Sequence, residues 1–124
     1  MRAPDDILAP PSPRDVERAI ALFATAARAA YGERLVGLYL FGSRARADHH
    51  PFSDVDIAVV LADGEVRLVP EKRRLADLTH DIILETGVEV QPWPIARAAW
   101  DNPDRQANAA LVKSMRRDAR RIEA

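Results

Sequence analysis

The sequence contains no cysteine. This absence excludes disulfide bonds and thiolate metal sites, and it fits a protein of the reducing cytoplasm. No apolar run is long enough to cross a membrane, and the first residues, MRAPDDILAPPSPRD, have acidic residues and prolines where a secretion signal needs an apolar segment. A net charge of −1 also lacks the positive excess typical of nucleic-acid-binding proteins. We therefore expect a cytoplasmic protein without a membrane anchor and without nucleic acid as a direct partner.

The composition is that of one globular domain. The chain has 124 residues, of which 48% are hydrophobic and 30% charged, enough for one core and too few for a second large domain. Prolines are concentrated at the N-terminus, which predicts a flexible, proline-rich arm over residues 1–12. The domain itself is expected to occupy residues 13–124.

Helices are indicated by apolar spacing and by end signals. Ser12 is a capping residue, Pro13 suits the first helical position, and Gly32 suits the end of the helix that follows. Pro70 and Gly87 give the same signals for a second long helix. The expected long helices are 13–30, 70–86 and about 103–122, with short helices at 43–47 and 95–100.

Three apolar stretches between these helices are expected to be strands. They cover residues 34–41, 54–61 and 88–91, and the Pro92-Trp93-Pro94 segment is expected to end the third strand. Helices and strands that alternate in this way predict an α/β or α+β domain, with helices packed on a small mixed sheet.

The second strand begins with a pair of carboxylates. Because side chains alternate along a strand, Asp54 and Asp56 are expected to lie on one face, with Val55 on the other. Two carboxylates this close repel each other unless a cation neutralises them, and oxygen ligands of this kind suit Mg²⁺ or Mn²⁺. The pair predicts a metal site of the type used in phosphoryl and nucleotidyl transfer, which commonly employs two ions.

A phosphate-binding corner precedes this pair. Gly42 allows the backbone to approach a phosphate closely, and the Ser43 hydroxyl can donate to a phosphate oxygen. Arg44 and Arg46 add positive charge nearby. Two roles stay open for each of them, namely contact with a phosphate and structural pairing with Asp48 or Asp54.

A third carboxylate is expected on the neighbouring strand. If Val88 and Val90 face the helices, Glu89 faces the same way as the aspartate pair. Glu89 is therefore the candidate for a third metal ligand, and it can also accept the proton of an acceptor hydroxyl.

These residues together carry a family resemblance. Gly42-Ser43, ten intervening residues and then Asp54-Val55-Asp56 resemble the signature of the DNA polymerase β-like nucleotidyltransferase superfamily. With its short length, the chain is similar to a minimal nucleotidyltransferase (MNT) domain over residues 13–122. Two positions depart from the family pattern, because Ala47 stands where glycine is frequent and Glu89 stands where aspartate is usual.

The resemblance implies ATP as the substrate, with two Mg²⁺ ions on Asp54, Asp56 and Glu89. It also implies a partner, because many small members are antitoxins that bind a HEPN-domain toxin and transfer AMP from ATP onto a toxin tyrosine. Two alternatives stay open. One is an antitoxin that neutralises its toxin by binding alone, and the other is a small-molecule nucleotidyltransferase completed by a partner subunit.

The two tryptophans carry a separate alternative. Trp93 and Trp100 are most simply core residues, but the flanking prolines also make Trp93 an interface candidate.

Overall fold

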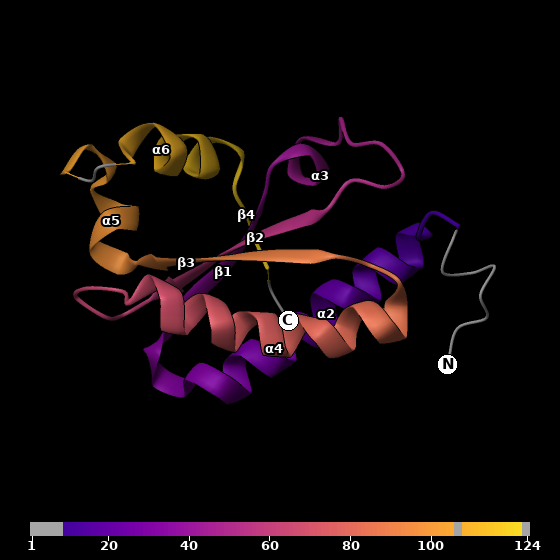
Figure 1. The fold of residues 1–124 in the computed structure, drawn as a ribbon. Coiled ribbons are helices and arrows are strands. Elements are labelled where there is room, and N and C mark those ends of the chain that lie inside the picture. Colours follow the sequence, from indigo (N-terminus) through magenta and orange to yellow (C-terminus); the bar gives the residue numbers. More distant parts are fainter. Residues whose placement is uncertain (1–8, 106–107, 123–124) are drawn as a thin grey trace.

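A computed structural model of the chain describes residues 9–105 and 108–122. Most of the proline-rich segment, residues 1–8, lies outside the described residues. A four-stranded sheet forms the middle layer of the fold, with helices on both of its faces (Figure 1). None of the helices in the described ranges is long and apolar enough to cross a membrane.

The N-terminal helix begins and ends where its sequence predicts. Helix α2 covers Pro13–Tyr31 and starts with a capping box, in which the Ser12 hydroxyl accepts from the Asp15 amide at 3.1 Å and the Asp15 carboxylate accepts from the Ser12 amide at 3.0 Å. Gly32, with φ of 55°, ends the helix. The helix is followed by a short 3₁₀ turn, η1 (Gly32–Arg34).

The sheet is mixed, as predicted, and its two central strands carry the site. Strand β1 (Leu35–Phe41) pairs antiparallel with β2 (Val55–Leu61), and β2 pairs parallel with β3 (Val90–Ala96). A short strand, β4 (Arg120–Arg121), pairs antiparallel with β1, which gives the order β3-β2-β1-β4.

Strand β3 is longer than predicted, and the prediction that Pro92-Trp93-Pro94 ends it is wrong. The Val55 amide donates to the Glu89 carbonyl at 2.9 Å. In a parallel ladder this places the backbone groups of the odd-numbered residues of β3 toward β2 and those of the even-numbered residues toward the open edge. Pro92 and Pro94 are even-numbered, so neither removes a hydrogen bond from the sheet. Both prolines are therefore compatible with an edge strand.

The C-terminal segment also differs from its prediction. In place of one helix over about 103–122, the chain forms η2 (Pro103–Arg105), helix α6 (Ala109–Asp118) and then β4. The Ile122 amide donates to the Leu38 carbonyl at 2.9 Å. Pairing with β1 satisfies backbone groups at an otherwise open sheet edge, a long-range gain that outweighs the helical pattern of the segment.

The other helices lie close to their predicted positions. Helix α4 (Leu68–Thr86) starts two residues before Pro70, which is tolerated in the first turn, and ends at Gly87 with φ of 73°. Two short helices, α3 (Ser43–Arg46) and α5 (Arg97–Asp101), complete the set.

Two apolar clusters fix the sheet between its helix layers. Helices α2 and α4 cover one face, and α5 and α6 cover the other (Figure 1). The side chains of β2 belong to the two clusters in alternation and are buried throughout, apart from the half-buried Asp56. A strand buried on both faces holds its one polar side chain in a fixed place. The largest fully buried side chains are Phe23, Leu38, Ile57, Leu61, Leu75 and Met115.

Candidate active site

Asp56 and Gly42 are in close contact where β1 and β2 lie side by side. Asp56 pairs with Phe41, the last residue of β1, and Gly42 follows directly. A Cβ atom on Gly42 would lie 2.6 Å from the Asp56 Oδ2 atom, and the φ of Gly42 is 76°. Only glycine satisfies both the backbone angle and the close approach. The predicted phosphate corner and the carboxylate pair therefore belong to one site.

Ser43 begins α3 and is held next to this contact. The short helix is closed by a hydrogen bond of 3.1 Å from the Arg46 amide to the Gly42 carbonyl. Gly42 and Ser43 are half-buried, which leaves them accessible to a ligand. Their predicted role in holding phosphate stays a prediction.

The carboxylate pair is partly shielded from water. Asp54 is exposed, whereas Asp56 is half-buried. Burial raises the pKa of Asp56 above its ordinary value, and the negative charge of Asp54 acts in the same direction; the indole N–H of Trp93 and the charge of Arg46 oppose them. A divalent cation would relieve the repulsion, so the donor set fits Mg²⁺ or Mn²⁺.

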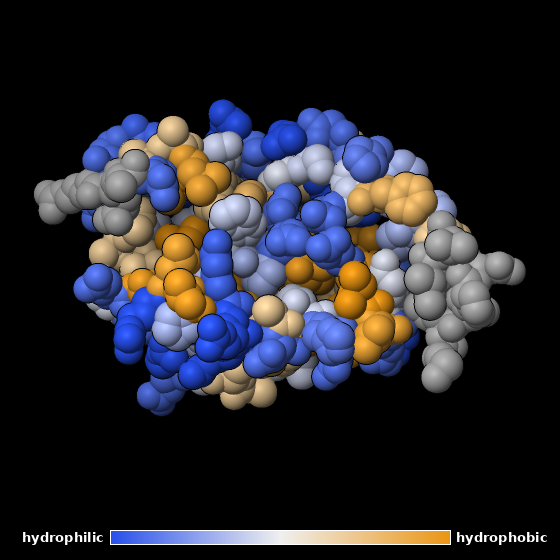
Figure 2. Space-filling model, viewed as in Figure 1, coloured by the Kyte–Doolittle hydropathy of each residue, from blue (hydrophilic) through white to orange (hydrophobic). Residues whose placement is uncertain are grey.

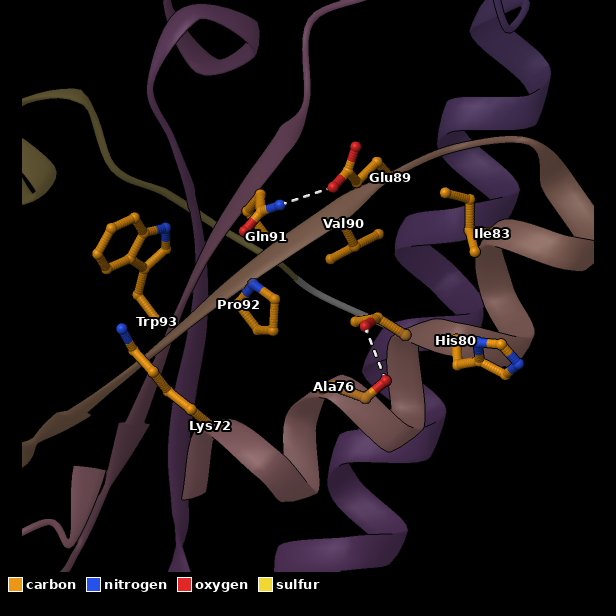
Figure 3. Close-up of a pocket in the computed structure, with 10 residues that line it drawn as sticks. Lys72, Ala76, His80, Ile83, Glu89, Val90, Gln91, Pro92 and Trp93 are labelled. Atoms are coloured by element: carbon orange, nitrogen blue, oxygen red, sulfur yellow. Dashed lines mark hydrogen bonds between the residues drawn. The ribbon is translucent and has the colours of Figure 1, made fainter. Parts of the chain in front are cut away.

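Glu89 lies just before β3 and beside this pair along the sheet. Gln91 is the register partner of Asp56, so Glu89, two residues earlier, shares the same strand face. Figure 3 shows Glu89 and Gln91 on one side of β3, where the Gln91 amide donates to Glu89 at 2.9 Å. Within residues 9–105 and 108–122, no three His, Cys, Asp or Glu side chains are grouped closely enough to hold a metal ion. The role of Glu89 as third ligand stays a prediction.

Arg44 is engaged by the loop that leads to Asp54. Its Nε donates to the Ser53 carbonyl at 3.0 Å and its Nη2 to the Pro51 carbonyl at 3.3 Å. Burial lowers the pKa of Arg44, and the negative charge of Asp54 opposes this shift. These contacts tie α3 to the loop before the carboxylate pair, so Arg44 supports the site as well as adding charge to it.

Arg46 makes two ion pairs. It contacts Asp48 at 3.0 Å, which is one of the structural pairings that its sequence position left open, and Asp118 at the end of α6 at 2.8 Å. The contact with Asp118 joins residues 72 positions apart and has no local sequence signal. Through it, the C-terminal helix holds α3 at the site.

A cavity of about 390 Å³ lies between α4 and β3 (Figure 3). Because β3 and β1 flank β2 on opposite sides, the cavity lies on the other side of Asp56 from Gly42. Lys72 points toward the indole ring of Trp93 and lies 5.5 Å from its centre. Trp93 was not expected at the site because the sequence places it beyond the end of β3. Its alternation with Glu89 and Gln91 is the signal that could have found it. The lining residues from this edge of the sheet are Glu89, which precedes β3, and Val90, Gln91, Pro92 and Trp93 of β3.

An apolar groove of about 410 Å³ continues from Lys72 and Trp93 toward α5 and α6. Its rim carries Leu68 and Leu111, which are 51% and 41% exposed. Figure 2 shows hydrophobic side chains gathered in this region, between α6 and the start of α4. Exposed apolar side chains around a groove are typical of a protein-contact surface.

The sequence matches both a protein-family profile and an individual relative. The profile described as nucleotidyltransferase domain matches residues 21–114. "Putative protein adenylyltransferase MJ1305" of Methanocaldococcus jannaschii is 31% identical over 62 residues, which cover 50% of this chain and 42% of that protein. The match therefore spans less than half the length of this relative.

Two solved structures share the fold. A toxin–antitoxin complex with AMP-PNP has a TM-score of 0.54 and 19% identity, over 80% of this chain and 68% of that chain. A mutant of the toxin–antitoxin pair MntA-HpeT has a TM-score of 0.52 and 20% identity, over 82% of this chain and 69% of that chain. At these identities the likeness establishes the fold, which agrees with the predicted mixed sheet and flanking helices.

Proposed function

This chain belongs to the nucleotidyltransferase domain family, and from that premise we propose that it transfers AMP from ATP to a hydroxyl of a partner protein. One observation carries the proposal: Gly42 lies against the Asp56 carboxylate, with Ser43 directly beside it. A phosphate corner and a carboxylate pair joined in this way fit a nucleoside triphosphate that is bound together with divalent cations.

In the proposed reaction each group of the chain has a separate task. Asp54, Asp56 and Glu89 hold the cations, which supply charge neutralisation on the triphosphate. Gly42 and Ser43 hold the β- and γ-phosphates, and the charges of Arg44 and Arg46 favour their binding. The acceptor hydroxyl attacks the α-phosphorus and loses its proton, which Glu89 accepts. A new phosphorus–oxygen bond forms, the bond to the β-phosphate oxygen breaks, and pyrophosphate leaves.

A protein acceptor is favoured over a small molecule. The exposed apolar groove beside Trp93 offers a surface for a partner protein. The relative MJ1305 is named a protein adenylyltransferase, and both solved structures contain a toxin–antitoxin pair. We propose that the chain is an MNT antitoxin, that its partner is a HEPN-domain toxin and that the acceptor is a toxin tyrosine.

A direct labelling experiment tests this function. The chain is incubated with ATP labelled at the α-phosphate, with Mg²⁺ and with the product of the neighbouring gene. We expect label on the partner, and none when Mg²⁺ is chelated or when Asp54→Ala/Asp56→Ala replaces the wild-type chain. The matched control is Asp77→Ala/Asp81→Ala, which removes two exposed carboxylates of α4 and should leave labelling unchanged. A second reaction contains an aminoglycoside in place of the partner protein, and label on the aminoglycoside would select a small-molecule transferase.

A second candidate is an antitoxin that neutralises its partner by binding alone. The observation that favours it is the absence, within the described residues, of a group of three carboxylate or imidazole ligands around Asp56. Neutralisation assays separate the two functions. Full neutralisation by the Asp54→Ala/Asp56→Ala chain, with no label on the partner in the wild-type reaction, would establish binding alone.

A further inference from the structure

The indole nitrogen of Trp93 is buried and has no hydrogen-bond partner in the structure. A buried N–H without a partner is costly, so one that a natural protein retains calls for an explanation, and a role in a catalytic or ion-binding site is one of them. The position of Trp93 on the sheet indicates which group its indole N–H serves.

Trp93 lies on the same face of the sheet as Asp56. Gln91 is the register partner of Asp56, and Trp93 is the register partner of Ala58, so both side chains of β3 project to the side that carries the carboxylate. Asp56 is thus the carboxylate that lies on the strand face of the unpaired indole N–H and next to it across the sheet. Asp56 thus lies between Gly42 on the β1 side and Trp93 on the β3 side.

Two contacts fix the orientation of the indole ring. Phe41 packs against it edge-on, with ring centres 6.4 Å apart and planes inclined at 67°. The Lys72 ammonium lies 5.5 Å from the ring centre. Pro92 and Pro94 restrict the backbone on both sides of Trp93. A donor held this firmly can restrict a carboxylate to one orientation.

We propose that Trp93 is a positioning residue for Asp56. Its indole N–H holds the carboxylate in the orientation that faces Asp54 and the phosphate corner. The consequence of this positioning, namely that the carboxylate is oriented to receive a cation, rests on the proposed function. The proposed hydrogen bond from Trp93 to Asp56 does not depend on that function.

The contact is tested without metal or substrate. The chain has two tryptophans, so the NMR spectrum shows two indole N–H signals. In the Trp100→Phe variant only one signal remains, which assigns it to Trp93. We expect Asp56→Ala to move the Trp93 signal upfield and to speed its exchange with solvent, whereas Asp54→Ala has a much smaller effect. A Trp93 signal that is the same with and without the Asp56 carboxylate overturns the proposal.

The consequence is tested by the binding of Mn²⁺ together with a non-hydrolysable ATP analogue. Trp93→Phe keeps an aromatic ring against Phe41 and removes the donor, so we expect Mn²⁺ affinity to fall about 10- to 100-fold, as for other groups that orient metal ligands. Trp93→His restores an N–H donor and should recover much of the loss. Trp100→Phe, the matched control, removes an indole that stacks on Tyr39 and should leave Mn²⁺ affinity unchanged. Equal Mn²⁺ affinity in wild-type and Trp93→Phe chains overturns the proposal.

These readouts separate the two proposals. A chain that binds Mn²⁺ in a Trp93-dependent way and labels no partner contradicts AMP transfer and supports the positioning role. A chain that labels its partner equally well with Trp93 and with Trp93→Phe contradicts the positioning role and supports AMP transfer.

Discussion

The Asp56 Oδ2 atom lies 2.6 Å from the point where a Cβ on Gly42 would stand. An alanine at this position would meet the carboxylate and would also be strained at φ of 76°. We expect Gly42→Ala to lower the free energy of unfolding by about 1–3 kcal/mol and to lower AMP transfer by about 10²-fold or more because the carboxylate is displaced. Urea denaturation and initial rates of labelling measure the two effects.

Gly32→Ala separates strain from displacement. Gly32 has φ of 55°, but no atom lies within 4 Å of its added Cβ. This variant should lose stability for the same backbone reason and keep full activity. Equal losses of activity in Gly32→Ala and Gly42→Ala would contradict the close contact between Gly42 and Asp56.

Ala47 adopts the left-handed backbone conformation that favours glycine. It follows α3 with φ of 61° and ψ of 27°. A Cβ in this conformation costs about 1–2 kcal/mol, and glycine loses about 0.5–1 kcal/mol in backbone entropy. We therefore expect Ala47→Gly to raise the free energy of unfolding by about 0.5–1 kcal/mol, measured by urea denaturation.

The control for Ala47→Gly is the same substitution in a right-handed helix. Ala21 is exposed in the middle of α2, and Ala21→Gly should lower the free energy of unfolding by about 1 kcal/mol. A lower free energy of unfolding for Ala47→Gly would show that Ala47 does not adopt the left-handed conformation.

The ion pair between Arg46 and Asp118 should make stability depend on pH. The hydrogen bond from Arg46 lowers the pKa of Asp118. The ionised Asp118 therefore stabilises the fold above its unfolded pKa, about 3.9, and this contribution is lost as the pH falls through the lower pKa of the folded state. We expect Asp118→Asn to have a lower melting temperature than the wild-type chain at pH about 7, with a difference that narrows below pH about 4.

Two further variants test this pairing. Asp77→Asn changes an exposed carboxylate of α4 and should alter the melting temperature little at any pH. Arg46→Gln should reproduce the effect of Asp118→Asn, and the double variant should lose less than the sum of the two single losses. Additive losses would contradict a direct contact.

Local signals in the sequence account for most of the fold. The capping residue Ser12 and the terminal Gly32 give the limits of α2, and the buried run between Val55 and Leu61 gives β2. Pairing between strands that are distant in sequence accounts for the two elements that were not predicted, namely β4 and the second part of β3. Strand β4 forms because β1 has an open edge, and β3 continues through Pro92 because its missing N–H faces away from β2.

The same division holds for the site. Gly42, Ser43 and the aspartate pair are close in sequence, so their spacing was enough to predict one site. Asp118 lies 72 residues from Arg46, and no pattern of short period connects them. The place of Trp93 beside Asp56 was not predicted for a related reason, since the face on which a strand side chain lies can be deduced only if the strand is known to extend that far.

Pro92 is expected to keep the edge of the sheet from pairing with other chains. Its backbone nitrogen faces the open edge of β3 and carries no hydrogen, which removes a donor that another strand would need. Pro92→Ala should restore this donor and increase self-association, measured by light scattering after size-exclusion chromatography. The control Pro70→Ala changes a helical proline and should leave the apparent mass unchanged. No increase with Pro92→Ala would show that the edge is protected in another way.

Glu89 and Gln91 lie on the same strand face as Asp56, so a carboxylate can be moved from one position to the other by substitution. Gln91 is the register partner of Asp56, while Glu89 is held by a hydrogen bond from Gln91. If the reaction needs a third carboxylate, Glu89→Gln should lower AMP transfer about 10²-fold or more, whereas Gln91→Ala, which frees the Glu89 side chain, should lower it much less. The double variant Glu89→Gln/Gln91→Glu returns a carboxylate to the same strand face, directly beside Asp56, and should recover part of the activity. Initial rates of labelling at saturating Mg²⁺ measure all three, and a Glu89→Gln chain with the wild-type rate would leave Asp54 and Asp56 as the only carboxylate ligands that the reaction requires.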